Sequence, residues 1–271
     1  MNCGLFFNSV IINIMEPAKK PVVAILSLTC CEGCQVAIFD LGERFLEFLT
    51  KVNIGDFQMA EEMPDVDKYD IAIVEGTAIT KEQKRRLKII RKKSKILIAI
   101  GACACLGGPQ EIKDYKGDKK QILRQIYPNI RGIDNPNIKS VKEMVKVDLE
   151  IPGCPINKEE FFGLILKVLA GEMPKILQKP VCEECPRKNK NCLLLLGKPC
   201  LGAISLAGCG APCPKNNFPC DGCRGPHDKI NLKAMKNALK IKAHLNGRDI
   251  EMILQRFGKL NELLKKYENT H

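Results

Sequence analysis

Short apolar runs alternate with amphipathic stretches over the first two thirds of the chain. The apolar runs are rich in β-branched side chains, and their length predicts strands that are buried on both faces. They span residues 22–28, 70–74, 95–100 and 145–151. Between them, apolar residues recur at helical spacing, as Ile38, Leu41, Phe45 and Phe48 do. The same spacing predicts helices over 81–93 and 161–169.

Strands that alternate with helices predict an α/β fold, with a parallel sheet covered by helices on both faces. Such sheets bind ligands at the carboxyl ends of their strands. Three cysteine motifs follow directly after predicted strands. We therefore expect these motifs to converge on one edge of the sheet.

The pattern changes near Pro174. Residues 180–226 are rich in Cys, Pro and Gly and show no periodicity, so metal binding is needed to supply folding energy. Residues 230–268 predict two helices, broken at Asn246-Gly247. The predicted domains are an N-terminal extension (1–20), an α/β domain (21–175), a cysteine-rich domain (176–227) and C-terminal helices (228–271).

The N-terminal stretch is apolar but too short to span a membrane, which takes about 20 apolar residues. It has neither a basic start nor a small-residue cleavage site. We interpret it as a disordered or wrongly assigned extension, with Met15 as a plausible start. Amphipathic anchoring is the alternative. No other segment is apolar enough over its length to span a membrane, so we expect no membrane partner.

The formal net charge is +12, which is compatible with a protein that binds nucleic acid. Basic residues concentrate between Lys81 and Lys95, where Leu87 and Ile90 keep amphipathic spacing. This pattern favours a solvated helix face over a nucleic-acid patch. We expect no nucleic-acid partner.

Fifteen cysteines are unusual for a chain of 271 residues. A secreted disulfide scaffold would be shorter and carry an export signal. In a reducing cytoplasm, which we expect for this chain, clustered cysteines more often bind metal. Twelve of them form three groups of four, and 4Fe–4S clusters are held by four thiolates each. The groups are Cys31, Cys34, Cys103 and Cys154; Cys182, Cys185, Cys192 and Cys200; and Cys209, Cys213, Cys220 and Cys223.

Zinc is the alternative metal, because pairs of C-x-x-C motifs also hold Zn²⁺. Histidine, the other common zinc ligand, is absent from the cysteine region until His227. Prolines follow Cys154, Cys185 and Cys213, as one does in some ferredoxins. The spacing favours iron and leaves zinc open. Cys3, Cys30 and Cys105 are spare.

Several of these motifs resemble those of the small subunits of nickel–iron hydrogenases. In the α/β domain they are Thr29–Cys34, Val74–Gly76, Ile100–Ala104 and Gly153–Pro155. In the cysteine-rich domain they are Pro180–Cys185, Lys198–Gly202 and Cys220–Gly225. The resemblance covers residues 22 to about 226. It is strongest to the cytoplasmic archaeal members, which include the sulfhydrogenase delta and F420-non-reducing hydrogenase small subunits.

The resemblance implies a flavodoxin-like domain and three 4Fe–4S clusters. A proximal cluster would use the quartet of Cys31, Cys34, Cys103 and Cys154. A medial cluster would use Cys209, Cys213, Cys220 and Cys223. A distal cluster would use Cys182, Cys185, Cys192 and Cys200. We call these sets the proximal, medial and distal quartets.

The resemblance also implies that the chain carries electrons and that the nickel–iron centre lies on a separate large subunit. The sequence contains neither a dinucleotide fingerprint nor a P-loop. A further redox subunit of flavin or NAD(P), F420, ferredoxin or disulfide reductase type would therefore handle the other end of the electron path.

Four residues near the motifs are open to more than one interpretation. Cys30 is adjacent to Cys31 and is an alternative ligand. Glu75 either supports a cluster ligand or relays protons, or it is a plain carboxylate at a strand end. Arg224 either tunes the medial cluster, faces a partner or forms a surface salt bridge. We expect His227 to be solvated.

Three other functions stay in consideration. One is an iron–sulfur subunit of a complex I-like or other oxidoreductase without hydrogen chemistry, although such relatives usually stop after the proximal cluster. Another is a zinc-binding module on nucleic acid. The last is an electron carrier that has no large subunit.

Overall fold

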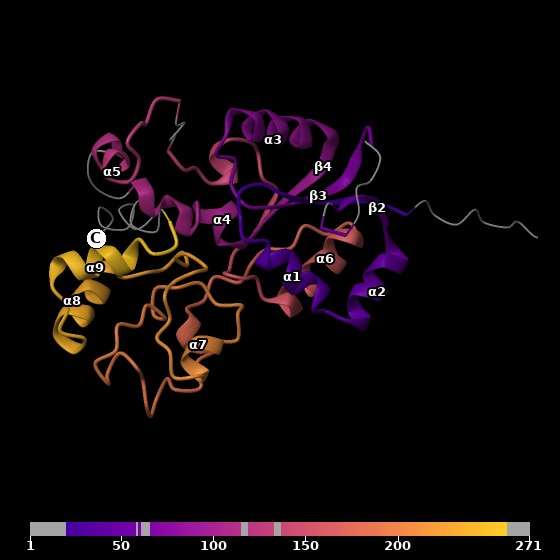
Figure 1. Ribbon diagram of the computed structural model, residues 1–271. Coiled ribbons are helices and arrows are strands. Elements are labelled where there is room, and N and C mark those ends of the chain that lie inside the picture. Colours follow the sequence, from indigo (N-terminus) through magenta and orange to yellow (C-terminus); the bar gives the residue numbers. More distant parts are fainter. Residues whose placement is uncertain (1–19, 58, 61–65, 115–118, 133–136, 259–271) are drawn as a thin grey trace, which may run out of the picture.

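The chain folds around a parallel sheet that is covered by helices on both faces (Figure 1). The structure is a computed structural model that describes residues 20–57, 59–60, 66–114, 119–132 and 137–258. In this part of the chain, five parallel strands lie in the order β2-β1-β3-β4-β5, which is the flavodoxin-like order. The strands are β1 (Val22–Ser27), β2 (Asn53–Phe57), β3 (Tyr69–Glu75), β4 (Ser94–Ile100) and β5 (Leu149–Ile151). The predicted α/β fold is confirmed.

Alternate side chains of the strands form a separate core on each face of the sheet. Val23 and Ile25 of β1 point to the face that is covered by α1 (Gly33–Phe39), α2 (Glu43–Lys51) and α6 (Lys158–Leu169). Ala24 and Leu26 point to the opposite face, under α3 (Lys81–Lys93) and α4 (Gly101–Leu106). The β-rich runs are continuous because both faces are buried.

Local signals explain where several helices begin. The Thr80 hydroxyl accepts the Gln83 N–H, and the Gln83 side chain accepts the Thr80 N–H, which forms a capping box at the start of α3. The stretch predicted as one helix around Ile38–Phe48 is instead α1 and α2. Gly42 separates them at φ 61°, a left-handed conformation that glycine adopts readily.

Other elements differ from the sequence prediction. β5 has three residues rather than the seven of 145–151. β2 was not predicted, because its five residues include Asn53 and Gly55, which have low strand propensity. The region between β4 and β5 contains further helices that the pattern did not indicate. They are α4, η1 (Pro109–Asp114), α5 (Lys119–Ile126) and η2 (Val141–Glu143).

The cysteine-rich segment has little regular structure and packs below the sheet in Figure 1. It contains η3 (Val181–Glu183) and α7 (Pro212–Lys215). After it, α8 (Leu232–Lys242) and α9 (Gly247–Leu254) share a core with Leu201 and Ile204. The Asn246 side chain caps α9, so the predicted break at Asn246-Gly247 is confirmed.

Some predictions lie outside the described residues. These are the N-terminal extension up to residue 19, the start at Met15 and the helix beyond residue 258. In the part of the chain that the structure covers, no helix is long and apolar enough to cross a membrane.

Asp148 ties β4, β5 and α3 together. Its carboxylate accepts the Leu97 N–H at 2.9 Å and an N–H of Arg91, and its side chain is 15% exposed. Partial burial alone would raise the pKa of Asp148. The bonds from Leu97 and Arg91 outweigh burial and hold that pKa below its usual value.

We expect Asp148→Asn to lower the free energy of unfolding at pH 7 by about 1–3 kcal/mol, because the Arg91 charge loses its partner. The folded-state pKa is depressed, so the carboxylate stabilises the fold above its unfolded-state pKa of about 3.9 and stops doing so as the pH falls through the folded-state value. Urea unfolding at several pH values should show the difference from wild type shrinking in acid. Asp40→Asn is the control, since Asp40 is 71% exposed. Equal stability of wild type and Asp148→Asn at pH 7 would contradict the prediction.

Candidate metal centres

The proximal quartet comes from three loops at the carboxyl edge of the sheet. Cys31 lies between β1 and α1, and Cys34 is in the first turn of α1. Cys103 is in α4, directly after β4, and Cys154 lies just after β5. The prediction that these motifs meet at one edge follows from parallel strand order, and the structure brings them there.

The thiols of this quartet are close enough to influence one another. Burial raises the pKa of Cys103 to about 11, and the neighbouring Cys154 and Cys31 thiols add to the rise. Burial also raises the pKa of Cys154, again with a contribution from Cys31. The pKa of Cys34 is raised by burial, by Glu75 and by Cys103. Electrostatic influence falls with distance, so the four thiols lie together.

Raised pKa values determine what these cysteines can do. A buried thiol that stays protonated at neutral pH is a poor nucleophile. All cysteines in the described part of the chain are free thiols. A metal centre supplies the positive charge that holds such groups as thiolates, so the donor set fits an iron–sulfur cluster.

Glycines give the sulfur atoms room. A Cβ atom on Gly101 would lie 2.5 Å from Cys34 Sγ, and one on Gly108 would lie 2.8 Å from Cys103 Sγ. Gly101 has φ +82° and Gly108 has φ +73°, which a residue with a side chain rarely adopts. The backbone at these two positions therefore forms a cradle around the proximal thiols.

Glu75 is buried at the end of β3 and holds the start of α1. Its carboxylate accepts the Cys34 N–H at 3.0 Å and the Gln35 N–H at 3.2 Å. Glu75 is therefore in direct contact with the backbone of a predicted ligand, rather than being a plain carboxylate at a strand end. The side-chain amide of Gln35 is also buried, and both its polar atoms lack a hydrogen-bond partner.

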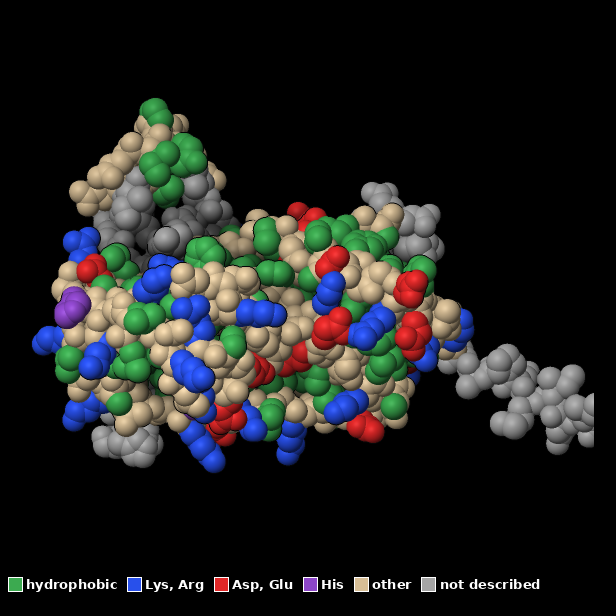
Figure 2. All heavy atoms as spheres, turned by 90° about the horizontal axis from the view of Figure 1, so that it is seen from below, with side chains coloured by type: hydrophobic (Ala, Val, Ile, Leu, Met, Phe, Trp, Pro, Cys, Tyr) green, Lys and Arg blue, Asp and Glu red, His purple; other side chains and the backbone are tan. Residues whose placement is uncertain are grey.

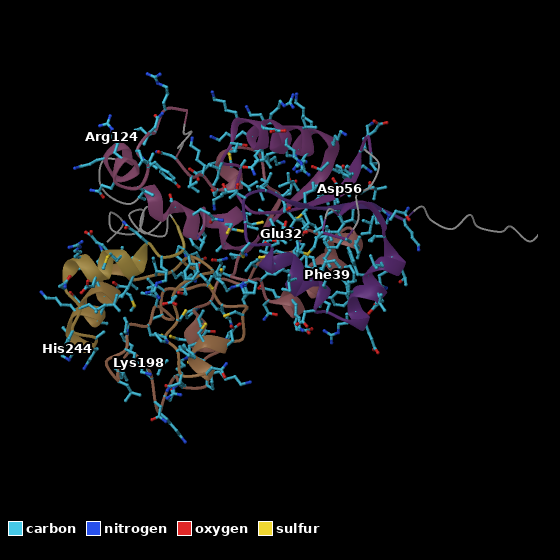
Figure 3. The ribbon with its side chains drawn as sticks, viewed as in Figure 1. Glu32, Phe39, Asp56, Arg124, Lys198 and His244 are labelled. Carbon is cyan, nitrogen blue, oxygen red and sulfur yellow. The ribbon has the colours of Figure 1, made fainter. Side chains whose placement is uncertain are left out.

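Cys30 and Cys31 occupy different environments. The Cys30 thiol donates to the Leu28 carbonyl at 3.7 Å and lies near Cys103, whereas Cys31 influences both Cys103 and Cys154. Directly after the two cysteines the chain turns at Glu32, which adopts the left-handed conformation at φ 61° (Figure 3). This turn leads from Cys31 into α1.

The distal quartet forms a second group. Burial raises the pKa of Cys182 to about 11, and Cys200, Cys185 and Cys192 all add to the rise, whereas Lys188 lowers it. Lysine and arginine side chains are spread over this end of the molecule, while most acidic side chains lie at the other end (Figure 2). Arg187, Lys188, Lys190 and Lys198 lie between the distal cysteines in the chain, so the surroundings of this quartet are basic.

The medial quartet surrounds a cavity of about 440 Å³, to which the proximal Cys154 also contributes. Burial raises the pKa of Cys223 to about 12, and Cys209, Cys154 and Cys213 add to the rise. Burial and the Cys200 and Cys223 thiols likewise raise the pKa of Cys220. Among the described residues, no three His, Cys, Asp or Glu side chains are close enough to hold a single metal ion. The cavity instead offers room for a larger group.

Two contacts connect the three quartets. The proximal Cys154 lines the medial cavity together with Cys223, and its thiol adds to the rise in the pKa of Cys223. On its other side, the N–H of the medial Cys220 donates to Sγ of the distal Cys200 at 3.2 Å. The medial quartet therefore lies next to both of the others.

Two residues near the quartets differ from the sequence interpretation. His227 was expected to be solvated, and this is wrong, because it is 5% exposed and bonds to the Lys229 N–H and the Ala203 carbonyl. Arg224 is 3% exposed, so the surface salt bridge is also wrong.

A further residue was not predicted: the Gln110 amide donates to Cys103 Sγ at 3.3 Å. No motif marks Gln110, which reaches the site only through the turn after α4.

Comparisons with known proteins agree with this geometry. Residues 31–168 match the family described as NADH ubiquinone oxidoreductase, 20 Kd subunit. The delta subunit of sulfhydrogenase 2 of Pyrococcus furiosus is 36% identical over 220 residues, which cover 80% of this chain and 92% of that protein. A subunit of the F420-non-reducing hydrogenase vhu of Methanocaldococcus jannaschii is 32% identical over an alignment 281 residues long, gaps included. The alignment covers 90% of this chain and 96% of that protein. The actinobacterial-type NiFe-hydrogenase of Ralstonia eutropha H16 has a chain of the same fold, with a TM-score of 0.56 at 20% identity, covering 95% of this chain and 93% of that one.

We expect Gly101→Ala to reduce the iron content of the anaerobically purified chain, because the new methyl group would displace Cys34 Sγ. Gly163→Ala is the matched control. Gly163 lies within α6, where an added Cβ meets nothing within 4 Å, and alanine there should stabilise the helix by up to about 1 kcal/mol. Iron analysis and chemical unfolding measure both effects. Full iron content in Gly101→Ala would contradict the cradle.

Proposed function

Because this chain belongs to the family of the NADH ubiquinone oxidoreductase 20 kDa subunit, and within it groups with the small subunits of hydrogenases, we propose that it relays electrons through three 4Fe–4S clusters between a nickel–iron site on a partner subunit and a second redox partner. The chain is thus a subunit of a hydrogenase-type oxidoreductase. The observation that carries the proposal is the position of the medial quartet between the other two, since Cys154 lines its cavity and Cys220 donates to the distal Cys200.

Each quartet would hold one cluster through its four thiolates. Bound clusters of this kind each accept and release one electron at a time. The residues of this chain fix where the clusters lie and which groups surround their sulfur atoms. N–H groups aimed at sulfur stabilise the more negative reduced state, so the Cys220 N–H, which donates to Cys200 Sγ, would raise the potential of the distal cluster.

At the proximal quartet we assign Cys31 rather than Cys30 as the ligand. Cys31 is close to both Cys103 and Cys154, whereas Cys30 is near Cys103 alone and its thiol is directed to the Leu28 carbonyl. Glu75 supports the ligand Cys34 in this proposal. Its carboxylate holds the N–H groups of Cys34 and Gln35 and so fixes the start of α1 against β3.

The catalytic large subunit would bind at the carboxyl edge of the sheet. Cys31 and Cys154 are exposed there, whereas Cys103 is partly buried and Cys34 is buried. A cluster in that position needs a protein surface to cover it, and the partner with the nickel–iron site would supply one. The distal quartet lies at the basic end of the molecule, where a flavin or NAD(P), F420, ferredoxin or disulfide reductase subunit would exchange electrons.

The state of the cysteines supports a reducing compartment. Those that the structure describes are free thiols, and clusters of free thiols are typical of cytoplasmic proteins. We therefore place the protein in the cytoplasm, without a nucleic-acid partner. Function in a complex I-like enzyme without hydrogen chemistry is less well supported, because the hydrogenase relatives match over 80% or more of this chain.

The test is an anaerobic pull-down of the tagged full chain, followed by metal analysis. We expect a brown protein with about twelve irons and as many sulfides per chain. We also expect it to copurify with a nickel-containing subunit. A colourless protein with bound zinc would contradict the clusters. A full set of iron without any nickel partner would contradict the hydrogenase assignment alone.

The ligand assignment is tested in the same preparation by two adjacent substitutions. Cys31→Ser should lose up to about four irons, whereas Cys30→Ser should keep the wild-type iron content. The opposite result would make Cys30 the ligand.

A further inference from the structure

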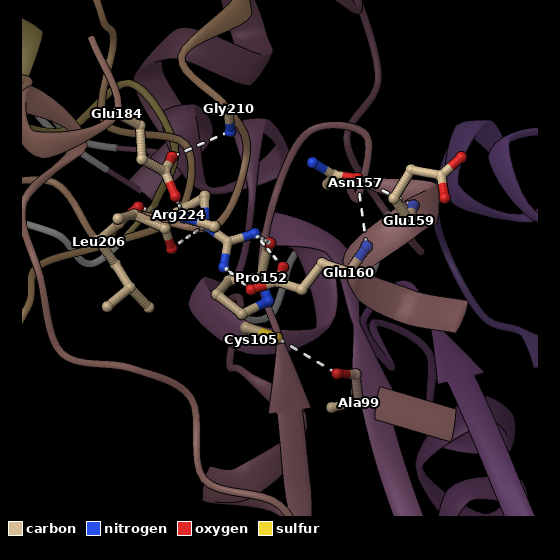
Figure 4. A network of polar contacts seen from close by, with 12 residues as sticks. Ala99, Cys105, Pro152, Asn157, Glu159, Glu160, Glu184, Leu206, Gly210 and Arg224 are labelled. Atoms are coloured by element: carbon tan, nitrogen blue, oxygen red, sulfur yellow. Dashed lines mark hydrogen bonds and ion pairs between the residues drawn. The ribbon is translucent and has the colours of Figure 1, made fainter. Parts of the chain in front are cut away.

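Arg224 is a buried arginine that follows directly after the medial ligand Cys223. Its side chain is 1% exposed, yet every nitrogen has an acceptor. Nε donates to the carbonyls of Leu206 and Ala207 at 3.2 and 3.0 Å, and Nη1 donates to the carbonyl of Pro152 at 2.7 Å. Figure 4 shows the guanidinium at the centre of this network. A buried charge with so many bonds is held in one position.

These acceptors belong to the loops that carry cluster ligands. Pro152 lies two residues before the proximal ligand Cys154, and Ala207 lies two residues before the medial ligand Cys209. Through Cys223, Arg224 is itself part of the medial loop. One side chain therefore connects both medial loops to the proximal loop.

Glu160 completes the network from α6, a helix of the α/β domain. Its carboxylate accepts two bonds from the guanidinium, at 2.7 and 2.8 Å. The pair packs tightly against Gly208, where a Cβ atom would lie 2.1 Å from Glu160 Oε1 and 2.6 Å from Arg224 Nη2. The ion pair between Arg224 and Glu160 thus joins the cysteine-rich segment to α6 of the α/β domain. It lies beside the medial cavity, which Arg224 lines.

The charge of Arg224 reaches the medial quartet. Arg224 lines the medial cavity together with all four medial cysteines, whereas Glu160 and Glu184 line a separate pocket. Glu184 is exposed and accepts the N–H groups of Gly208 and Gly210, so water screens its charge more than that of the guanidinium. Within this network the buried positive end is the one that faces the medial thiols.

We propose that Arg224 is a positioning residue that fixes the medial quartet against the proximal quartet, and that its buried charge raises the reduction potential of the medial cluster. This inference rests on the proposed function. Reduction adds one negative charge to a cluster, and a fixed positive charge nearby stabilises the reduced state. With Arg224 in place, the medial cluster accepts an electron from its neighbour more readily.

The experiment is a redox titration of the anaerobically purified complex, followed by electron paramagnetic resonance of the individual clusters. Arg224→Met alone would leave the partly buried Glu160 carboxylate without its ion-pair partner, so the test variant is the double substitution Arg224→Met with Glu160→Gln. Arg224→Lys keeps the charge but loses the planar fork. Arg44→Met is the control. Arg44 pairs with Glu159, the neighbour of Glu160 on α6, but its side chain is 53% exposed.

We expect the double variant to lower the midpoint potential of the medial cluster more than that of the other two. Arg224→Lys should keep that potential near the wild-type value while weakening the magnetic coupling between the medial and proximal clusters. Arg44→Met should change neither. Selective loss of the medial cluster from the double variant would also support the positioning role.

Two results would overturn the inference. One is a double variant with all three clusters and an unchanged medial potential, and the other is equal loss of every cluster, which indicates a purely structural role. Both leave the proposed function intact. Absence of clusters from the wild-type complex would instead refute the proposed function, and this inference with it.

Discussion

In the function proposed for this chain, the structure would depend on the bond between thiolate and metal. Twelve sulfur atoms are gathered into three groups, and burial raises the pKa of many of these thiols, to about 11 at Cys103 and Cys182 and about 12 at Cys223. Ionising several such thiols side by side is unfavourable without a compensating positive charge. Bound iron would supply that charge, so cluster binding and local folding would be coupled. Such coupling would explain how residues 180–226 adopt a defined path with little regular structure of their own.

The rest of the fold holds the three groups at fixed positions. Parallel strands end at one edge, where their loops bring together Cys31, Cys34, Cys103 and Cys154. The cysteine-rich segment cannot build an equivalent scaffold, so it is held by the sheet domain through Arg224 and Glu160 and by the core that α8 and α9 form. An electron relay needs such fixed spacing, because each quartet must lie close to the next.

Much of the sheet domain could be predicted because its signals are local. Helix α3 begins and ends at the predicted residues, since its apolar spacing is clear and Thr80 and Gln83 mark its start. The grouping of cysteines followed from spacing and resemblance. β2 escaped prediction because its short sequence is stabilised by pairing with β1 rather than by its own propensity. The burial of Arg224 could not be predicted either, because it depends on Glu160, which lies 64 residues away in the sequence.

The most direct test of the account is X-ray diffraction from anaerobically grown crystals of the complex, with anomalous data collected at the iron and zinc absorption edges. The account predicts three compact iron signals on this chain, one within each quartet, with the medial signal between the other two. Fewer than three iron signals, a zinc signal in any quartet, or cysteines joined as disulfides would contradict it.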